Sequence, residues 1–586
     1  MTHAPSWNLN DLYQGMTDPK IQQDLNHIEE LIQVFAKQYE GKVASLSASH
    51  LAQAIGSYEQ INEKLGRPYT FAHLIFAQDM SHAEGPLFYQ RIKEKASDLS
   101  TALLFFTLEL NEITDEQMKH LLAKSADLQR YKSWLGQVRV FKDHQLSKDM
   151  EKILHEKAIS SSNNWVRLYD ETFSHMRFLV DGVEQDVSQI INQLTDPSEE
   201  KRKKAAKAFG EGLEKNSSLL TLIMNTLMKD KEVEDKWRKY PAPISYRNKE
   251  NFVEDEVVEA LLTTVQEYFP KISHRYYGLK AEWMGKKVLP YWDRNAPLPE
   301  AEDRHIPWEE AKEIVLTAYG KFSPEMATIG QEFFDKHWID AALRPGKDTG
   351  AFSHPCIPSV HPYILQNYHG KILDVMTLAH ELGHGIHQVL SARRGYLMSD
   401  TPLTLAETAS IFGEMLTFQS LLESSSPKER KILLASKVSD MLNSIVRQVA
   451  FCLFEKKIHA ARKKGELSAD QIGQIWLEVQ RESLGPVLSF DPEYSHYWSY
   501  ISHFFHVPFY VYAYAFGNCL VNSLYATYQK GLPNFEEKYL DLLKAGGTLH
   551  HQELLKPFGL NTADPKFWRQ GLDLIVEYLD ELESLP

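Results

Sequence analysis

The segment from Ile372 to Ala392 reads ILDVMTLAHELGHGIHQVLSA and decides the fold of the region around it. Its apolar residues recur at spacings of three and four, which predicts an amphipathic or buried helix. Residues four apart on a helix share a face, so His380 and His384 can both point at one metal ion. Without a metal they would be buried imidazoles beside a buried acid, which is a possible but costly arrangement.

Glu381 completes the pattern H-E-x-x-H at residues 380–384. Two imidazoles and a carboxylate at this spacing are what zinc-dependent peptide hydrolysis requires. Glu381 would lie beside the ion, where it can take a proton from a water molecule that the metal activates. His387 is expected to pack in the core or to support a ligand, because three histidines from one short stretch rarely converge on one tetrahedral ion.

A zinc site of this kind needs a third ligand from another element and an open fourth position. Residues 402–415 predict a helix, with Thr401 as its cap and Pro402 in its first turn. Glu407 and Glu414 are seven apart and share an otherwise apolar face. A carboxylate there is costly unless it is paired, hydrogen-bonded or metal-bound. We expect Glu407 to be the ligand and Glu414 to orient a ligand histidine, and the alternative is that both face solvent.

Composition narrows the class of protein. The chain has 586 residues, 43% of them hydrophobic and 24% charged, which is ordinary for a globular protein. A net charge of −15 argues against nucleic acid as a partner. Three widely spaced cysteines and no visible signal peptide indicate a cytoplasmic protein. The longest apolar run, Phe504–Val521, carries too many polar residues for a membrane span, so no membrane partner is expected.

Helical periodicity dominates the chain and predicts a mainly α fold. A β-hairpin is expected at Phe178–Glu184, where Asp-Gly separates residues that favour strands. Asp196 and Pro197 are expected to open a charged helix, with Asp196 as its cap. This point predicts the boundary between an N-terminal helical region with the hairpin, residues 1–195, and a catalytic zinc region, residues 196–586.

The stretch before the zinc helix, residues 344–368, is rich in proline and glycine and suggests short strands and turns. One strand, near residues 350–354, could offer a free edge to an extended peptide, whose backbone would be held without its side chains being read. The alternative is an ordinary connecting loop.

A second group of polar side chains lies at residues 503–517. Pro508 can open a helix on which Tyr510 and Tyr514 share a face, while Tyr512 points elsewhere. Phenol and imidazole donors next to a zinc site, here the tyrosines and His503, can stabilise the oxyanion of a tetrahedral intermediate. The alternative is an aromatic helix that packs in the core with its hydroxyls satisfied locally.

Together these segments resemble oligoendopeptidase F, within the thimet oligopeptidase–neurolysin superfamily of zinc metallopeptidases. The segments that carry the resemblance are Trp7–Tyr13, Arg344–Phe352, Thr377–His387, Leu405–Ser410 and His503–Gly517. They run nearly from end to end of the chain. The resemblance implies a mainly α fold: a large multi-helix body with a deep substrate channel and a small β-sheet beside the zinc site.

The resemblance also implies the residues of the site. His380, His384 and Glu407 match the ligands of one Zn²⁺ per chain, and Glu381 matches the general base. The catalytic donors to substrate and oxyanion are matched by three residues: His503, Tyr510 and Tyr514.

The expected activity is that of a zinc metalloendopeptidase, which hydrolyses internal bonds of short oligopeptides. Two alternatives stay open. An aminopeptidase of the same zinc class would need a site for a free α-amine, and no G-x-M-E-N segment is present. A catalytically silent peptide-binding or scaffold protein would keep the fold, and the complete set of ligands with Glu381 argues against it. The sequence leaves the oligomeric state open.

Overall fold

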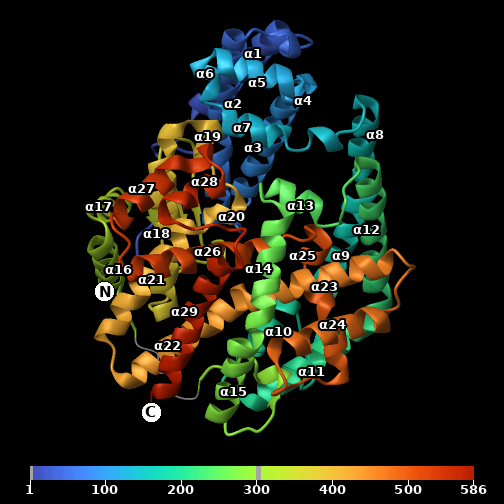
Figure 1. Ribbon diagram of the computed structural model, residues 1–586, viewed down its shortest axis with the longest axis vertical. Coiled ribbons are helices and arrows are strands. Elements are labelled where there is room, and N and C mark those ends of the chain that lie inside the picture. The colour runs from blue at the N-terminus through green and yellow to red at the C-terminus, as the bar shows by residue number, and fades with distance from the viewer. Residues whose placement is uncertain (1–3, 299–304, 586) are drawn as a thin grey trace. The chain divides into compact units, whose positions relative to one another are not determined.

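Helices dominate the computed structural model, which describes residues 4–298 and 305–585 (Figure 1). The predicted mainly α class is confirmed, and the substrate channel stays a prediction. In the described part of the chain, no helix combines the length and the apolar character needed to cross a lipid bilayer. The residues between 298 and 305 lie outside this description.

The chain forms two compact units, and each unit joins three separate segments. Unit 1 consists of Met1–Val140, Asp303–Ser424 and Thr527–Leu560. Unit 2 consists of Phe141–Glu302, Ser425–Ala526 and Asn561–Pro586. The predicted boundary between residues 195 and 196 stays a prediction.

Unit 1 contains the helix with the H-E-x-x-H motif. Its elements are α1 (Pro19–Tyr39), α2 (Ala48–Gln78), α3 (Glu84–Thr101), α4 (Leu104–Glu112), α5 (Asp115–Lys124), α6 (Ala126–Gln129), α7 (Lys132–Arg139), α16 (Trp308–Phe322), α17 (Pro324–Asp335), β4 (Ile339–Asp340), β5 (Phe352–His354), β6 (Tyr363–Leu365), α18 (Ile372–Ser391), α19 (Tyr396–Ser399), α20 (Leu403–Ala406), α21 (Thr408–Ser424), α27 (Phe535–Ala545) and α28 (His551–Leu555).

Unit 2 contains the predicted hairpin and the histidine–tyrosine segment. Its elements are α8 (Lys148–Ala158), α9 (Ser162–His175), β1 (Phe178–Val180), β2 (Val183–Gln185), α10 (Val187–Gln193), α11 (Glu199–Lys215), α12 (Ser217–Arg238), α13 (Ser245–Glu250), α14 (Asp255–Tyr268), α15 (Ser273–Trp283), β3 (Leu289–Pro290), α22 (Pro427–Ser444), α23 (Val446–Arg462), α24 (Ala469–Leu484), β7 (Leu488–Ser489), α25 (His503–His506), α26 (Tyr512–Gln529, whose last three residues belong to unit 1) and α29 (Pro565–Ser584).

The helix predicted from the opening segment is α18, and it forms the centre of unit 1. The carboxylate of Asp374 accepts the backbone N–H groups of His369 and Lys371 at 2.8 and 2.9 Å, which satisfies donors at the helix start. The apolar face of α18 is buried, and α21, α16, α17 and α27 pack around the helix (Figure 1). This packing fixes the helix that carries both motif histidines.

A three-stranded sheet in the order β4-β6-β5 lies against α18. Strand β4 is parallel and β5 antiparallel to the buried central strand β6, so β5 is an edge strand. The loop between β4 and β5 is held by Lys347, whose ammonium contacts Asp340 at 2.7 Å with both side chains fully buried. Arg344 pairs with the same carboxylate. The edge strand predicted near residues 350–354 is confirmed, because among the described residues β5 pairs with β6 alone in the order β4-β6-β5.

In unit 2 the predicted hairpin is confirmed, because β1 pairs antiparallel with β2. Asp181 and Gly182 have φ values of +51° and +82°, which is the positive pair that a tight type I′ turn requires. The predicted start of the charged helix, α11, is wrong by two residues. Ser198 caps α11 with its hydroxyl, while Asp196 accepts the Ser198 N–H at 2.8 Å in a turn that precedes the helix.

Candidate metal centre and histidine–tyrosine cluster

The three expected metal ligands come together within unit 1. His380 and His384 project from α18, one turn apart, and Glu407 lies at the junction of α20 and α21. The single helix predicted over residues 402–415 is wrong, since the structure has two helices that meet at Glu407. The break places Glu407 directly before α21, the helix that packs on α18. Its position therefore differs from that of a residue in the middle of one straight helix.

The two distances from Glu407 to the histidines fit a tetrahedral zinc ion. Glu407 Oε2 lies 3.3 Å from His380 Nε2 and 3.4 Å from His384 Nε2, and one ligand atom from each residue lies within 4.8 Å of the others. Zinc bonds of about 2.0–2.1 Å at tetrahedral angles separate neighbouring ligands by about 3.3–3.4 Å. The donor set, two imidazoles and one carboxylate, is also one that zinc prefers.

The surrounding charges favour a cation at this position. Glu414 Oε2 lies 3.3 Å from Nδ1 of His380, on the side of the ring opposite Glu407. Burial alone lowers the pKa of His380, but hydrogen bonds to Glu407 and Glu414 outweigh it and raise the pKa to about 10. Burial likewise raises the pKa of Glu407, yet the two histidines overcome it and hold that pKa far below its usual range.

Neighbouring hydroxyl groups hold Glu407 and its backbone in place. Ser410 Oγ donates to Glu407 Oε2 at 2.7 Å, which fixes the rotamer of the carboxylate. The hydroxyl of Tyr539 in α27 donates to the backbone carbonyl of Thr408 at 2.9 Å, next to the helix junction. Neither the Ser410 nor the Tyr539 contact can be predicted from the sequence, because both depend on how α21 and α27 pack.

Glu381 is buried beside the metal-binding group, with 7% of its surface exposed. Burial raises the pKa of its carboxyl, while His380 and the backbone N–H of Ser353 act in the opposite direction. Ser353 belongs to β5, and it exchanges hydrogen bonds of 2.9 and 3.1 Å with Gln388 of α18. These hydrogen bonds fix the edge strand β5 to α18, the helix that carries Glu381. The buried Glu381 carboxyl group has a raised pKa.

Gly383 allows α18 and α21 to approach closely, and nothing in the sequence pattern indicates this role. A Cβ atom at this position would lie 2.5 Å from the carbonyl oxygen of Ala409 and 2.7 Å from Cα of Ser410. Real Cβ atoms do not come that near to backbone. Gly383 lies between the two histidines, and its contacts are two and three residues beyond Glu407. The distance from the imidazoles to the carboxylate therefore depends on this glycine.

We expect Gly383→Ala to separate the two helices and to weaken metal binding by at least tenfold. The added methyl group would push against the backbone of Ala409 and Ser410, and a shift of this backbone would move Glu407 away from the histidines. Metal content after dialysis and the thermal midpoint measure the effect. The matched control is Gly320→Ala in α16, where the new Cβ would meet Ala327 at an ordinary 3.5 Å. Full metal content in Gly383→Ala would show that the helix spacing does not set the site.

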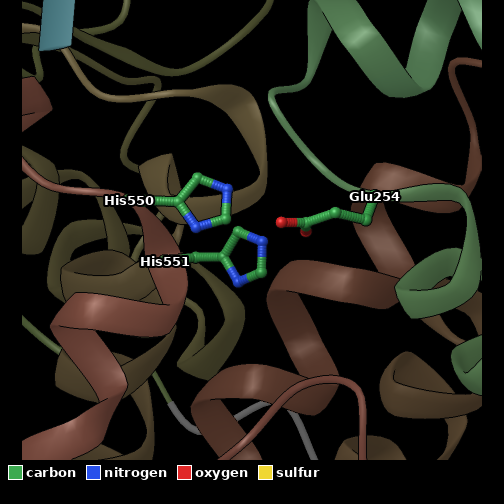
Figure 2. A group of neighbouring side chains, drawn as sticks. All are labelled: Glu254, His550 and His551. Atoms are coloured by element: carbon green, nitrogen blue, oxygen red, sulfur yellow. The ribbon is translucent and has the colours of Figure 1, made fainter.

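Among the described residues of unit 1, no other histidine joins the three ligands. His387 is buried, its Nε2 has no hydrogen-bond partner among the described residues, and burial lowers its pKa to about 4. His550 and His551 lie with their ring centres 4.0 Å apart at the start of α28 (Figure 2). Glu254, also labelled there, belongs to unit 2. Within unit 1 this pair supplies only two ligands, fewer than zinc requires.

The expected oxyanion donors form a separate cluster within unit 2. Tyr514 Oη lies 3.4 Å from Nε2 of His503, and the rings of Tyr510 and Tyr514 lie 5.4 Å apart. Tyr512 points elsewhere as predicted, since it is buried and its hydroxyl accepts a hydrogen bond from Asn251 at 2.9 Å. Burial lowers the pKa of His503, and the nearby His506 and Arg447 act in the same direction.

The prediction that Pro508 opens a helix is wrong. Helix α26 starts at Tyr512, and Pro508 lies in a tight turn that precedes it. Proline with its fixed φ suits the second position of such a turn as well as the first turn of a helix, so the sequence could not separate the two.

Comparisons of the sequence with known proteins agree on one group. The family described as "Peptidase family M3" matches residues 192–574, and that described as "Oligopeptidase F" matches residues 109–178. Oligopeptidase PepF of Bacillus subtilis is 28% identical over 99% of this chain and 87% of its own length. An oligoendopeptidase F homolog of Lactococcus lactis is 25% identical over 100% of this chain and 98% of its own.

Solved structures share the fold over nearly the whole length. A Chlamydophila abortus protein superposes with a TM-score of 0.88 at 24% identity, covering 99% of this chain and 98% of its own. Oligoendopeptidase-F from Enterococcus faecium superposes with a TM-score of 0.72 at 21% identity, covering 97% of this chain and 98% of its own.

Proposed function

The chain belongs to peptidase family M3, and on this premise we propose that it is a zinc-dependent endopeptidase that hydrolyses internal bonds of short oligopeptides. One observation carries the proposal: two imidazoles and a carboxylate lie at the spacing of a tetrahedral zinc ion, beside the buried acid Glu381. The oligopeptidase names of its relatives support the substrate class. A cytoplasmic location belongs to the same proposal, because the three cysteines are buried free thiols.

In this proposal His380, His384 and Glu407 hold one zinc ion, and Glu414 keeps the His380 ring oriented through Nδ1. When bound, zinc supplies Lewis acidity, which lowers the pKa of a water molecule and polarises a peptide carbonyl. Glu381 takes a proton from the attacking water and returns it to the leaving amine. Burial raises the pKa of its carboxyl, which makes the carboxylate a better proton acceptor in the first step.

The tyrosine cluster has the second role in the proposal. The phenol of Tyr514, helped by His503 or Tyr510, donates a hydrogen bond to the negative charge that develops on the carbonyl oxygen. Their closeness within unit 2 supports a common role, since the three rings lie within about 6 Å of one another and one hydrogen bond joins two of them.

We expect Tyr514→Phe to lower kcat by about 10²–10³-fold, because one donor to the oxyanion is lost. KM should change little, since the donor acts mainly on charge that appears during the reaction. Steady-state kinetics with a quenched fluorescent peptide measure both constants. Tyr512→Phe is the matched control, as it removes a buried phenol of the same helix that points elsewhere. Equal losses of kcat in both variants would contradict the assigned role.

A peptide blocked at both ends, with a fluorophore and an internal quencher, tests the proposed function. Cleavage of this peptide, abolished by a chelator and restored by zinc, is the expected result. Cleavage of free-amine peptides alone would indicate an aminopeptidase. Tight peptide binding without cleavage by the zinc-loaded protein would indicate a binding or scaffold protein, and either outcome would reject the endopeptidase.

A further inference from the structure

A strained turn directly precedes the helix that carries Tyr514. The N–H of Tyr510 donates to the carbonyl of Val507 at 3.1 Å, which closes a four-residue turn. Pro508 takes its second position, and Phe509 its third with a φ of +59°. A positive φ after proline is typical of a type II turn, where glycine or asparagine is usual. Phenylalanine disfavours this left-handed conformation, so something else must hold it there.

The carboxyl group of Glu455 in α23 holds this residue. Glu455 Oε1 accepts the backbone N–H of Phe509 at 2.7 Å, and the glutamate side chain is buried. Its second oxygen has no hydrogen-bond partner among the described residues. Burial raises the pKa of Glu455 to about 8, which shows how unfavourable the interior is for its charge. A buried carboxyl group whose hydrogen-bond partner is one backbone N–H needs an explanation, and the turn that this N–H belongs to supplies one.

The other side of the turn has its own contact. Arg247 Nε donates to the carbonyl of Pro508 at 3.3 Å, and its guanidinium lies 5.7 Å from the centre of the Tyr510 ring. The ring of Phe509 is fully buried, with its centre 5.0 Å from that of His459. The backbone at residues 508 and 509 is therefore fixed from both sides, and the next residue in the chain is Tyr510.

From these contacts we infer that Glu455 is a positioning residue: its carboxyl group keeps Phe509 in the left-handed conformation and so sets the Tyr510 phenol for the reaction. The inference rests on the proposed function, in which Tyr510 assists at the oxyanion. Without the acceptor, the turn can relax to a negative φ at Phe509. Because Tyr510 follows directly, such a change would rotate its backbone and move its hydroxyl. A misplacement of about 1 Å can cost about 10²-fold in rate.

Three single variants test the acceptor. Glu455→Gln keeps an oxygen acceptor of the same shape, so kcat should stay within about threefold of wild type. Glu455→Met keeps the volume and removes the acceptor, so kcat should fall by about 10–100-fold while KM stays within about threefold. Val446→Ala truncates a buried side chain on the opposite face of the same helix and controls for lost stability alone. It should leave kcat unchanged.

A double-mutant cycle separates positioning from general support of the fold. In a Tyr510→Phe background, Glu455→Met should cost less than about twofold further in kcat, because the phenol it positions is already absent. Losses that multiply would overturn the inference, as would a wild-type kcat in Glu455→Met. Should Glu455→Met fail to fold, Glu455→Asp withdraws the carboxyl group by one methylene and enters the same cycle with the same expected pattern.

The cycle also distinguishes this inference from the proposed function. A slow Tyr510→Phe with a normal Glu455→Met would leave the role of Tyr510 intact and overturn only the positioning role. A wild-type kcat in Tyr510→Phe would remove Tyr510 from the proposed function and overturn the inference with it. Cleavage of the blocked peptide by the wild-type protein is required in either case.

Discussion

Glu381→Gln is expected to lower kcat by about 10²–10⁴-fold while the protein keeps its zinc. The amide has nearly the shape of the carboxylate but cannot take a proton from water, and general base catalysis typically contributes that factor. Metal binding should persist, because the ligand atoms belong to His380, His384 and Glu407. Turnover of the blocked quenched peptide and elemental analysis of the same sample measure the two properties together.

The control for this variant is Glu423→Gln, which makes the same chemical change on the exposed end of α21, where the carboxylate pairs with the exposed Lys321. Its kcat should equal that of the wild type. A Glu381→Gln enzyme within threefold of wild type would refute the general base. Loss of zinc from that variant would make Glu381 a metal ligand.

Glu407→Ala is expected to abolish zinc binding, and with it activity. A catalytic zinc site uses three protein ligands, and the remaining two histidines would hold the ion weakly. Glu414→Ala should lower zinc affinity only by about 10–100-fold, because Glu414 contacts Nδ1 of His380 and not the ion. Titration with a competing chelator measures both affinities, and excess zinc should restore activity to Glu414→Ala alone.

The opposite pattern, with zinc lost from Glu414→Ala and kept by Glu407→Ala, would exchange the two assignments. Ser410→Ala provides an intermediate case, since it removes the 2.7 Å hydrogen bond to Glu407 Oε2 and leaves every ligand in place. Its zinc affinity should fall between those of the wild type and Glu407→Ala.

The parts of the fold that depend on residues close together in the sequence were predicted correctly. Helix α18 follows from apolar spacing alone, and the shared face of His380 and His384 follows from helical geometry. The hairpin at Asp181 and Gly182 follows from the backbone freedom of that pair. In each case the determining contacts lie within a few residues of one another.

The parts that depend on packing could not be predicted in the same way. Gly383 stands at a variable position of the motif, and only the approach of α21 shows why a side chain is excluded there. The helix break at Glu407 has no glycine or proline to mark it. The left-handed Phe509 carries no signal in the sequence either, because its conformation depends on Glu455, 54 residues away.

The division into two units has the same cause. Each unit joins three separate segments, and the composition of the sequence does not show which segments pack together. Periodicity reports which face of a helix is buried but not which partner buries it.

This interleaving affects how the protein can be made. Many large proteins fold domain by domain while the ribosome is still adding residues. Here unit 1 receives its third segment only with residues 527–560, and unit 2 its third segment only after residue 560. The carbonyl of Thr408, beside Glu407, must wait for Tyr539 to be synthesised. A nascent chain that stops before residue 527 therefore lacks one segment of each unit, and the apolar surfaces that these segments cover stay exposed until they are synthesised.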